Sequence, residues 1–421
     1  MNFNKELQKK QLSKFIKINP IEKVKKDSIL KKISMADIQP HHRKIENYMI
    51  SKYNGGSKFR NGDTLMARIT PCLENGKTAF VDILNSNEIA FGSTEFIVLR
   101  NIKDESINKY VYYFTISPKF RNLAIKSMTG TSGRQRVQED VLKNFAFIVP
   151  EIEEQKNIVS ILSSLDDKIE LNNQVNKNLE QIAQAIFKHW FIDFEFPNEN
   201  GEPYKSSDGE MVDSELGPIP KGWNVRSLNQ IANFLNGLAM QKYRPLNDEN
   251  YLSVLKIKEL KVGKTSKNSD KCSMNIDPKY IVNDGDVVFS WSGSLEVKLW
   301  CDGKAGLNQH LFKVTSANYP KWFYYYWIKH HIEDFRRIAE GKTTTMGHIK
   351  REHLSKAKVF DPGKKFFEKF DKVINGLIEL YINNEKEIKY LSQIRDILLP
   401  KLISGEIRVP VNNKVLIIKN N

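Results

Sequence analysis

Cysteine is scarce in this chain of 421 residues. The three cysteines, Cys72, Cys272 and Cys301, are odd in number, form no C-x-x-C pair and have no histidine at metal-ligand spacing. We therefore expect free thiols in a reducing compartment. No apolar run approaches the roughly 18 residues of a membrane-spanning helix, and the N-terminal segment lacks the apolar core of a signal peptide. These absences predict a cytoplasmic protein without membrane association.

Complete catalytic motifs are also missing. None of the three Gly-Lys-Thr tripeptides has the upstream glycine that a phosphate-binding loop requires. No dinucleotide-binding glycine pattern, Asn-Pro-Pro-Tyr-like tetrapeptide, zinc-protease motif or nucleophile elbow occurs. A metal-dependent nuclease needs only scattered carboxylates and a lysine, so intrinsic catalysis stays open as an alternative. We expect no catalysis by this chain, and no metal or cofactor bound to it.

Charge is the first positive signal. The chain has 65 Lys and Arg against 50 Asp and Glu, a formal net charge of +15. Such an excess favours a polyanionic partner through counterion release, and nucleic acid is the natural candidate. The alternative is a lysine-rich solvated surface that reflects an AT-rich coding bias. Composition is otherwise that of a globular protein, and the length predicts two or three domains.

The two halves of the sequence share a pattern. A Gly-Asp step opens an apolar strand at 62–67 and again at 285–290, and a second strand follows at 91–98 and at 305–314. Beyond these strands the halves match without gaps at an offset of 212 residues, and the matched pairs include Val137 and Ile349, Leu142 and Leu354, and Pro150 and Pro362. This match predicts a genuine internal duplication.

Each half ends in a long amphipathic helix, predicted at about 152–190 and 364–399. About 35 residues extend roughly 50 Å, longer than one small domain, so antiparallel pairing of the two helices is the economical solution. Asn172 and Asn384 occupy equivalent places, where they either form a buried pair that fixes the register or face water. The predicted helix-pairing residues are Ile158, Leu162, Leu165, Ile169, Leu179, Ile182, Ile186, Phe370, Val373, Leu377, Leu391, Ile394 and Leu398.

The predicted fold class is α+β, with two mixed α/β domains separated by two long antiparallel helices in a pseudo-twofold internal repeat. The predicted segments are a first domain at 1–150, a first helical region at 151–195, a linker at 196–218, a second domain at 219–362, a second helical region at 363–405 and a tail at 406–421. The linker is assigned from its Pro, Gly and acidic residues.

Polar, glycine-containing segments precede each long helix, at 128–136 and 340–351. Arginine bonds guanine with two hydrogen bonds, glutamine bonds adenine, and threonine reaches a base edge or a phosphate. The alternative for both segments is an ordinary surface loop. The ends of the Gly-Asp strands add further candidates, although Trp291 there fits a core position equally well. The candidate DNA-binding residues are Arg68, Thr70, Thr131, Ser132, Arg134, Gln135, Arg136, Ser290, Ser292, Lys342, Thr343, Thr344, Thr345, His348, Lys350 and Arg351.

These segments differ between the halves while the frameworks match, so the two domains are expected to read different sequences. The expected target is asymmetric and divided, with two half-sites and an unread spacer. Domains at opposite ends of a helical pair of about 50 Å would contact sites roughly 15 base pairs apart, or fewer with tilt.

Over essentially its full length the chain resembles the specificity subunit of type I restriction-modification systems. The segments that carry the resemblance are 58–65 (KFRNGDTL), 67–78 (ARITPCLENGKT), 150–155 (PEIEEQ), 216–223 (LGPIPKGW) and 399–405 (LPKLISG). The resemblance implies two target recognition domains separated by two conserved helices. It also implies binding to double-stranded DNA, to two modification (methyltransferase) subunits and to restriction (translocase/endonuclease) subunits. S-adenosylmethionine, ATP and Mg²⁺ would then belong to those partner subunits.

The second half departs from this pattern, because its helix begins after Pro362 and Gly363 and lacks the Glu154-Gln155 pair of the first. That difference puts the second docking surface in doubt. The leading interpretation is a non-catalytic DNA-binding specificity subunit. One alternative is a nuclease or methyltransferase with unrecognised motifs. The other is a structural or RNA-binding scaffold built on a coiled coil, although the chain shows no aromatic pattern typical of RNA-binding sheets.

Overall fold

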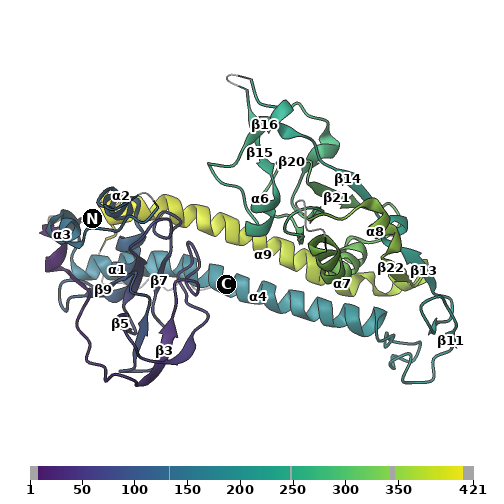
Figure 1. Cartoon of the computed structure of the whole chain (residues 1–421), viewed down its shortest axis with the longest axis horizontal. Coiled ribbons are helices and arrows are strands. Elements are labelled where there is room, and N and C mark those ends of the chain that lie inside the picture. Colours follow the sequence, from purple (N-terminus) through teal and green to yellow (C-terminus); the bar gives the residue numbers. More distant parts are fainter. Residues whose placement is uncertain (1–7, 132, 247–248, 342–346, 411–421) are drawn as a thin grey trace. The chain divides into compact units, whose positions relative to one another are not determined.

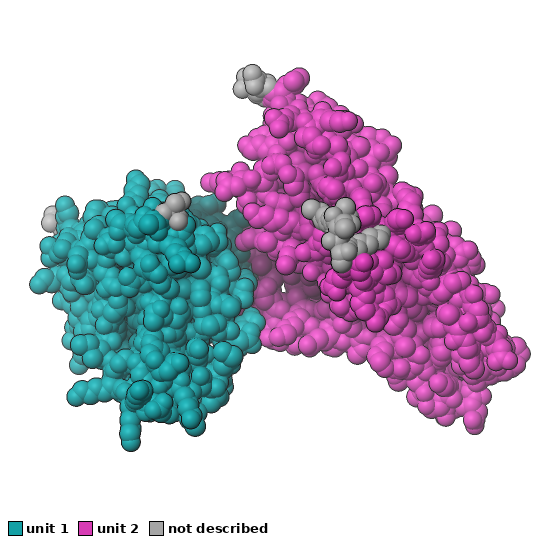
Figure 2. All heavy atoms as spheres, viewed as in Figure 1, with its two compact units in different colours: residues 1–169, 391–421 teal, residues 170–390 magenta. Residues whose placement is uncertain are grey.

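The chain folds as two compact units, the first comprising residues 1–169 and 391–421 and the second residues 170–390 (Figure 2). The computed structural model describes residues 8–131, 133–246, 249–341 and 347–410, and Figure 1 traces their helices and strands. Each unit contains strands, short helices and part of both long helices, so the first unit draws on two distant parts of the sequence.

The first unit contains two four-stranded sheets, ordered β2-β9-β6-β7 and β4-β3-β8-β5, and a separate antiparallel pair, β1 with β10. Strands β3 and β8 run parallel, and the other paired strands are antiparallel. The strands are β1 (Gln8–Gln11), β2 (Ile16–Ile18), β3 (Ile29–Ile33), β4 (Met49–Lys52), β5 (Ser57–Arg60), β6 (Thr64–Ala67), β7 (Thr78–Phe80), β8 (Ile89–Gly92), β9 (Phe96–Asn101) and β10 (Ala146–Val149).

The second unit repeats this topology. Its two four-stranded sheets are ordered β14-β21-β18-β19 and β16-β15-β20-β17, its parallel pair is β15 with β20, and β13 pairs with β22. The strands are β11 (Met211–Val212), β12 (Ile219–Pro220), β13 (Asn224–Ser227), β14 (Asn233–Asn236), β15 (Tyr251–Leu255), β16 (Lys271–Ser273), β17 (Ile281–Val282), β18 (Val287–Ser290), β19 (Val297–Leu299), β20 (Ala305–Leu307), β21 (Leu311–Thr315) and β22 (Lys358–Asp361). The shared strand order confirms the predicted internal duplication.

The Gly-Asp strands of the sequence are β6 and β18, and all four residues of each are buried. A strand covered on both faces has no solvent-facing side, which explains why neither segment alternates between apolar and polar residues with period two. The shorter helices of the first unit are α1 (Asn108–Ile116), α2 (Pro118–Lys126) and α3 (Glu139–Asn144). Those of the second unit are α5 (Leu228–Ile231), α6 (Ile257–Val262), α7 (Lys321–Glu340) and α8 (Arg351–Lys356).

The two long helices are α4 (Ile152–Phe191) and α9 (Lys364–Ser404), and they pack antiparallel. In the first unit, Asp166 of α4 accepts a hydrogen bond of 2.8 Å from Arg395 of α9. In the second unit, Asn172 donates to Glu387 at 2.7 Å and Asn176 donates to Glu385 at 2.7 Å. Residue numbers rise along α4 as those of its partners fall along α9, so the predicted antiparallel pairing is confirmed.

The two asparagines proposed as a register pair are not bonded to each other. Asn172 is 3% exposed and bonds Glu387, whereas Asn384 donates to Asn176 Oδ1 at 3.0 Å. Each asparagine therefore lies in the seam between the helices. Its partner is not the other asparagine, as their equivalent positions in the sequence suggested, but another polar residue of the seam. The middle of the seam is polar and hydrogen-bonded, which fixes the register of the pair.

Most of the predicted pairing residues are buried or half-buried, including Ile158, Leu162, Leu165, Ile169, Leu179, Ile186, Phe370, Leu377, Leu391 and Leu398. Three lie outside the seam: Ile182, Val373 and Ile394 are 48%, 47% and 46% exposed. On α9 the buried seam instead uses Ile374, Ile378 and Ile382. The prediction of the three exposed residues is wrong because apolar periodicity did not fix the rotation of each helix: the neighbouring Ala183 on α4 and Ile374 on α9 are the buried residues.

The sequence also left an aromatic core unpredicted. Phe191, at the end of α4, is fully buried and makes ring contacts with Trp322 and Trp327 of α7 and with Phe366 of α9. Phe196, in the predicted linker, is 8% exposed and stacks on the rings of Tyr204 and Trp223 with centroid separations of 4.6 and 5.0 Å. The chain between the two repeats is thus anchored on the second unit.

Candidate nucleic-acid interface

Three segments of the first unit meet at one place, beyond the end of β6. The Arg68 N–H donates to the Glu95 carbonyl at 2.9 Å, and the Val137 N–H donates to the Arg68 carbonyl at 2.9 Å. The Thr70 N–H donates to the Gln135 carbonyl at 3.1 Å. The end of β6, the turn before β9 and the loop after α2 are therefore held together by backbone hydrogen bonds. Two segments that the sequence analysis chose separately are brought together here.

The second unit builds the same arrangement beyond the end of β18. The Trp291 N–H points to the His310 carbonyl at 3.4 Å, and the Ile349 N–H donates to the Trp291 carbonyl at 2.9 Å. A bridge between Ser292 and His348 matches the bridge between Ile69 and Arg136 in the first unit. Backbone pairing thus makes Trp291, His310 and His348 the equivalents of Arg68, Glu95 and Arg136. We call Arg68, Glu95 and Arg136 the first junction. We call Trp291, His310 and His348 the second junction.

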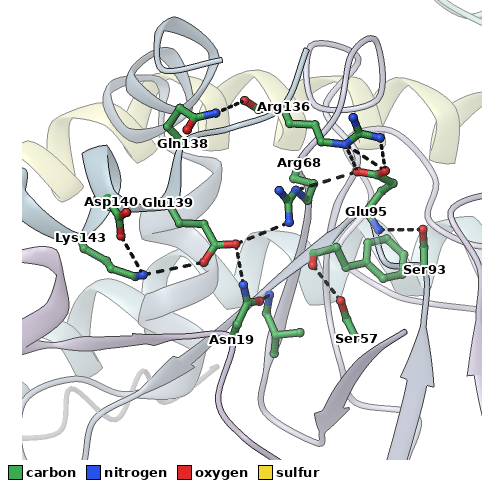
Figure 3. Close-up of polar contacts among 12 residues, drawn as sticks. Asn19, Ser57, Arg68, Ser93, Glu95, Arg136, Gln138, Glu139, Asp140 and Lys143 are labelled. Carbon is green, nitrogen blue, oxygen red and sulfur yellow. Dashed lines mark hydrogen bonds and ion pairs between the residues drawn. The ribbon is translucent and has the colours of Figure 1, made fainter. Parts of the chain in front are cut away.

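The first junction is a cluster of ion pairs (Figure 3). Arg136 lies against the Glu95 carboxylate with its Nη2 2.7 Å from Oε1 and its Nε 3.0 Å from Oε2. Arg68 lies between two carboxylates, 3.9 Å from Glu95 and 3.7 Å from Glu139. The hydrogen bond from Arg136, more than any other contact, lowers the pKa of Glu95 from its ordinary value. Glu95 is therefore an anion that both arginines share.

The second junction is aromatic. The Trp291 ring lies 5.8 Å from that of His310 and 6.3 Å from that of His348, measured between centroids. Ser292 Oγ is 3.1 Å from His310 Nδ1, and the Trp291 indole N–H donates to the Gln309 carbonyl at 3.2 Å. The equivalent backbone positions thus carry entirely different chemistry in the two units.

The predicted contact residues that the structure describes fall into three groups by exposure. Thr131, Arg134, Lys350 and Arg351 are exposed, and Arg68, Thr70, Gln135, Arg136 and His348 are half-buried at the junctions or beside them. Ser290 and Ser292 are buried, at 0% and 3% exposed. Ser290 is a correction: its hydroxyl donates to the Ser294 carbonyl at 2.6 Å and accepts from the Glu296 N–H at 2.8 Å, so it stabilises the turn after β18. Ser132, Lys342, Thr343, Thr344 and Thr345 lie outside the described residues.

Glu95, Gln309 and His310 were missed by the sequence analysis. They lie just before β9 and β21, because the matched stretches 91–98 and 305–314, each predicted as one strand, are divided by a turn into parts of two strands. The available signal was the pair of polar turns 93–95 and 308–310, whose residues differ between repeats while the strands after them correspond. Residues that differ within the matched stretches therefore mark the variable positions of the site.

Neither metal ligands nor a membrane span were found in the parts of the chain that the structure describes. There, no group of three His, Cys, Asp or Glu side chains is arranged to hold a metal ion. No helix in the same ranges combines the length and the apolar character needed to cross a bilayer.

Comparison with known proteins gives the class of this arrangement. The model of the type I restriction modification DNA specificity domain matches the chain twice, over residues 4–181 and 220–390. The chain belongs to this family of type I DNA specificity domains. The two matched ranges cover the two repeats. Membership places the chain's role in the recognition of DNA sequence as one part of a complex, and catalysis lies in other subunits of such complexes.

Individual members of the family cover most of the chain. The type I restriction enzyme MjaIX specificity subunit of Methanocaldococcus jannaschii is 29% identical over 327 residues, which is 74% of this chain and 72% of the relative. The HindI specificity subunit of Haemophilus influenzae is 25% identical over 427 residues, 87% of this chain and 91% of the relative. A crystal structure of the type I S subunit from M. genitalium shares the fold, with a TM-score of 0.53 at 15% identity over 96% of this chain and 97% of that one.

Proposed function

We propose that this type I specificity chain reads one asymmetric, divided DNA sequence, with each unit reading one half-site. The supporting observation is the pair of junctions, which share backbone pairing but not side chains. A common frame with different side chains is expected of two readers of different sequences. Arginine suits guanine edges and phosphates, whereas histidine and tryptophan offer hydrogen bonds and apolar contact.

Partner binding forms the second part of the proposal. On the part of α9 that belongs to the first unit, two apolar side chains are 46% and 61% exposed and lie three residues apart, so they share one face of the helix. We call this pair the outer stripe; its members are Ile394 and Ile397. An exposed apolar stripe on a long helix favours a protein partner. We assign it to the modification subunits, of which two would bind, with restriction subunits joining the same complex.

The chemistry of the complex is then divided between subunits. S-adenosylmethionine would be bound by the modification subunits, and ATP with Mg²⁺ by the restriction subunits. This chain would recognise the target sequence. It would do so in the cytoplasm, where the DNA of a prokaryotic cell is found. Its absence would abolish methylation and cleavage together, since neither activity would find its site.

The test is to co-express the chain with the modification subunit of its own system and to map methylated positions across the host genome. A control strain carries the modification subunit alone. We expect a divided, asymmetric methylated motif that disappears without this chain. An unchanged methylation pattern, or a single continuous motif, contradicts the proposal.

A further inference from the structure

A basic hollow opens in the second unit, beside the second junction. It has a volume of about 830 Å³ and lies between the β15–β16 hairpin, the short helix η2 (Met240–Lys242) and the turn 308–310. His310 belongs both to this hollow and to the second junction. The two features therefore form one continuous surface of the unit.

Positive charge dominates the lining of the hollow. Four cationic side chains, Arg244, Lys256, Lys258 and Lys271, face a single carboxylate, that of Asp270. Lys256 is paired with Asp270. Lys271 lies over the Tyr251 ring, with Nζ 4.0 Å from the centroid. Arg244 and Lys258 are exposed and, within the described ranges, neither lies in a salt bridge, although the charge of Arg244 contributes to lowering the pKa of Asp270. The hollow thus carries uncompensated positive charge on three separate elements.

The lining of the hollow also contains amide side chains, which can form hydrogen bonds with base edges. Asn308 is 6% exposed and accepts a hydrogen bond of 3.3 Å from the His310 N–H, but its amide nitrogen donates to no acceptor among the described residues. Gln309 is half-buried next to it, with its amide nitrogen 3.4 Å from His310 Nε2. The Asn308 amide nitrogen is not among the fully buried unpaired atoms of the described residues, so solvent reaches it and an incoming acceptor can replace that solvent.

Apolar side chains underlie these polar groups. Met240 and Val254 line the hollow and are 3% and 1% exposed. They belong to a small core cluster with Leu252, Cys272 and Ile276. The polar groups therefore stand on a packed base, which holds them in place and lowers the local dielectric constant.

We propose that this hollow is the DNA-reading site of the second unit, with Arg244, Lys258 and Lys271 on phosphates and the Asn308 and Gln309 amides on a base edge. Amide side chains bond adenine with two hydrogen bonds, so an A·T pair is the expected contact. The proposal rests on the proposed function, namely that the second unit reads DNA at all. It adds the place and the base, which the family does not supply.

Duplex DNA fits the arrangement better than a small phosphorylated ligand. The cations come from the segment after η2, from α6 and from β16, so they are distributed around the opening instead of converging on one point. A distributed set of cations suits a row of phosphates along a strand. Binding of a mononucleotide in place of duplex DNA would contradict the proposal.

The first experiment measures salt-dependent DNA affinity of the complex with the modification subunit. The test variant is Lys258→Ala with Lys271→Ala, and the control is Lys264→Ala with Lys267→Ala, two exposed lysines of the same unit outside the hollow. Each lost phosphate contact lowers the slope of log affinity against log salt by about 0.9. We expect the slope to fall by about two in the test variant alone. Equal slopes in test and control overturn the proposal.

The second experiment maps genomic methylation by the Gln309→Ala and Asn308→Ala complexes. We expect the motif to relax at an A·T pair of one half-site while the other half-site is retained. An unchanged motif, or relaxation in both half-sites, overturns the assignment of the hollow. The wild-type complex separates this result from the proposed function: without a divided, chain-dependent motif in wild type the proposed function itself fails, whatever the variants do.

Discussion

Arg136 and Glu95 form a two-nitrogen ion pair, with Nη2 2.7 Å from Oε1, at the position where the second unit has His348 and His310. Arg68 lies 3.9 Å from the same carboxylate. An anion already bound to both arginines competes with any base edge or phosphate that approaches them. If DNA binds at the first junction, as proposed, it has to replace or rearrange an internal partner, whereas the hollow of the second unit has cations outside any salt bridge.

Replacing Glu95 tests this competition directly. The Glu95→Gln variant removes the shared negative charge, so we expect tighter binding to non-specific DNA and a salt slope steeper by about one. Fluorescence anisotropy of the complex with its modification subunit, at several salt concentrations, measures both. Glu46→Gln removes an exposed carboxylate of the same unit and is the matched control. Weaker binding by Glu95→Gln would show instead that Glu95 positions the arginines for DNA.

The ion pair between Asp166 and Arg395 is expected to stabilise the first unit. Asp166 is 3% exposed and also accepts the Tyr113 hydroxyl at 2.7 Å. The Asp166→Ala variant removes a buried carboxylate and leaves the half-buried Arg395 with Asp396 alone, which should cost about 3 kcal/mol in the free energy of unfolding. Urea unfolding measures this loss. Asp396→Ala removes the other, exposed partner of Arg395 and should cost less than about 1 kcal/mol.

The polar middle of the helix seam makes stability depend on pH. Burial raises the pKa of Glu385, opposed by its hydrogen bond with Asn176 and by the charge of Lys298. A raised folded-state pKa contributes stability that is greatest below the ordinary value near 4.5 and is lost as pH rises through the folded value. The Glu385→Gln variant should therefore be more stable than wild type at pH 8, and the difference should shrink toward pH 5.

Urea midpoints at the two pH values measure this difference, and Glu379→Gln on the exposed face of α9 is the control. A gain in stability that stays the same at both pH values would mean that packing, not charge, limits this part of the seam.

The two faces of α4 near its end should respond very differently to truncation. Phe191 is fully buried among aromatic rings, so Phe191→Ala should lower the free energy of unfolding by about 3 to 5 kcal/mol. Ile182→Ala removes a side chain that is 48% exposed, and its cost should be under about 1 kcal/mol. A similar loss of unfolding free energy in both variants would show that Ile182 is packed in the seam after all.

The outer stripe predicts a variant that folds but does not assemble. Ile394→Asp with Ile397→Asp changes two exposed side chains, so the chain should keep its helical content while it loses the modification subunit in gel filtration. Gln393→Glu, an exposed neighbour, adds charge without touching the stripe and should assemble normally. Assembly of the double variant would place the docking surface elsewhere.

Sequence periodicity and the internal match were sufficient for the duplicated α+β framework, because buried strands and long amphipathic helices depend on many residues at once. They were not sufficient for the rotation of each helix about its own axis. Ile374 and its neighbour Val373 are similar apolar residues, and only packing decides which of them is buried. The same limit applied to the site. Arg136 looked free for DNA until the fold placed Glu95, which is 41 residues away in the sequence, against it.

Glu154, at the start of α4, is 5% exposed and receives Arg408 at 2.7 and 2.8 Å. The core of the first unit likewise includes Leu399, Leu402 and Ile403. During translation, the N-terminal part of the first unit therefore leaves the ribosome before the residues that cover its apolar surface and pair with Glu154. Arg408, the partner of Glu154, is synthesised some 250 positions later. The second unit comes from one continuous stretch of chain, so all of its residues are synthesised before those that complete the first unit.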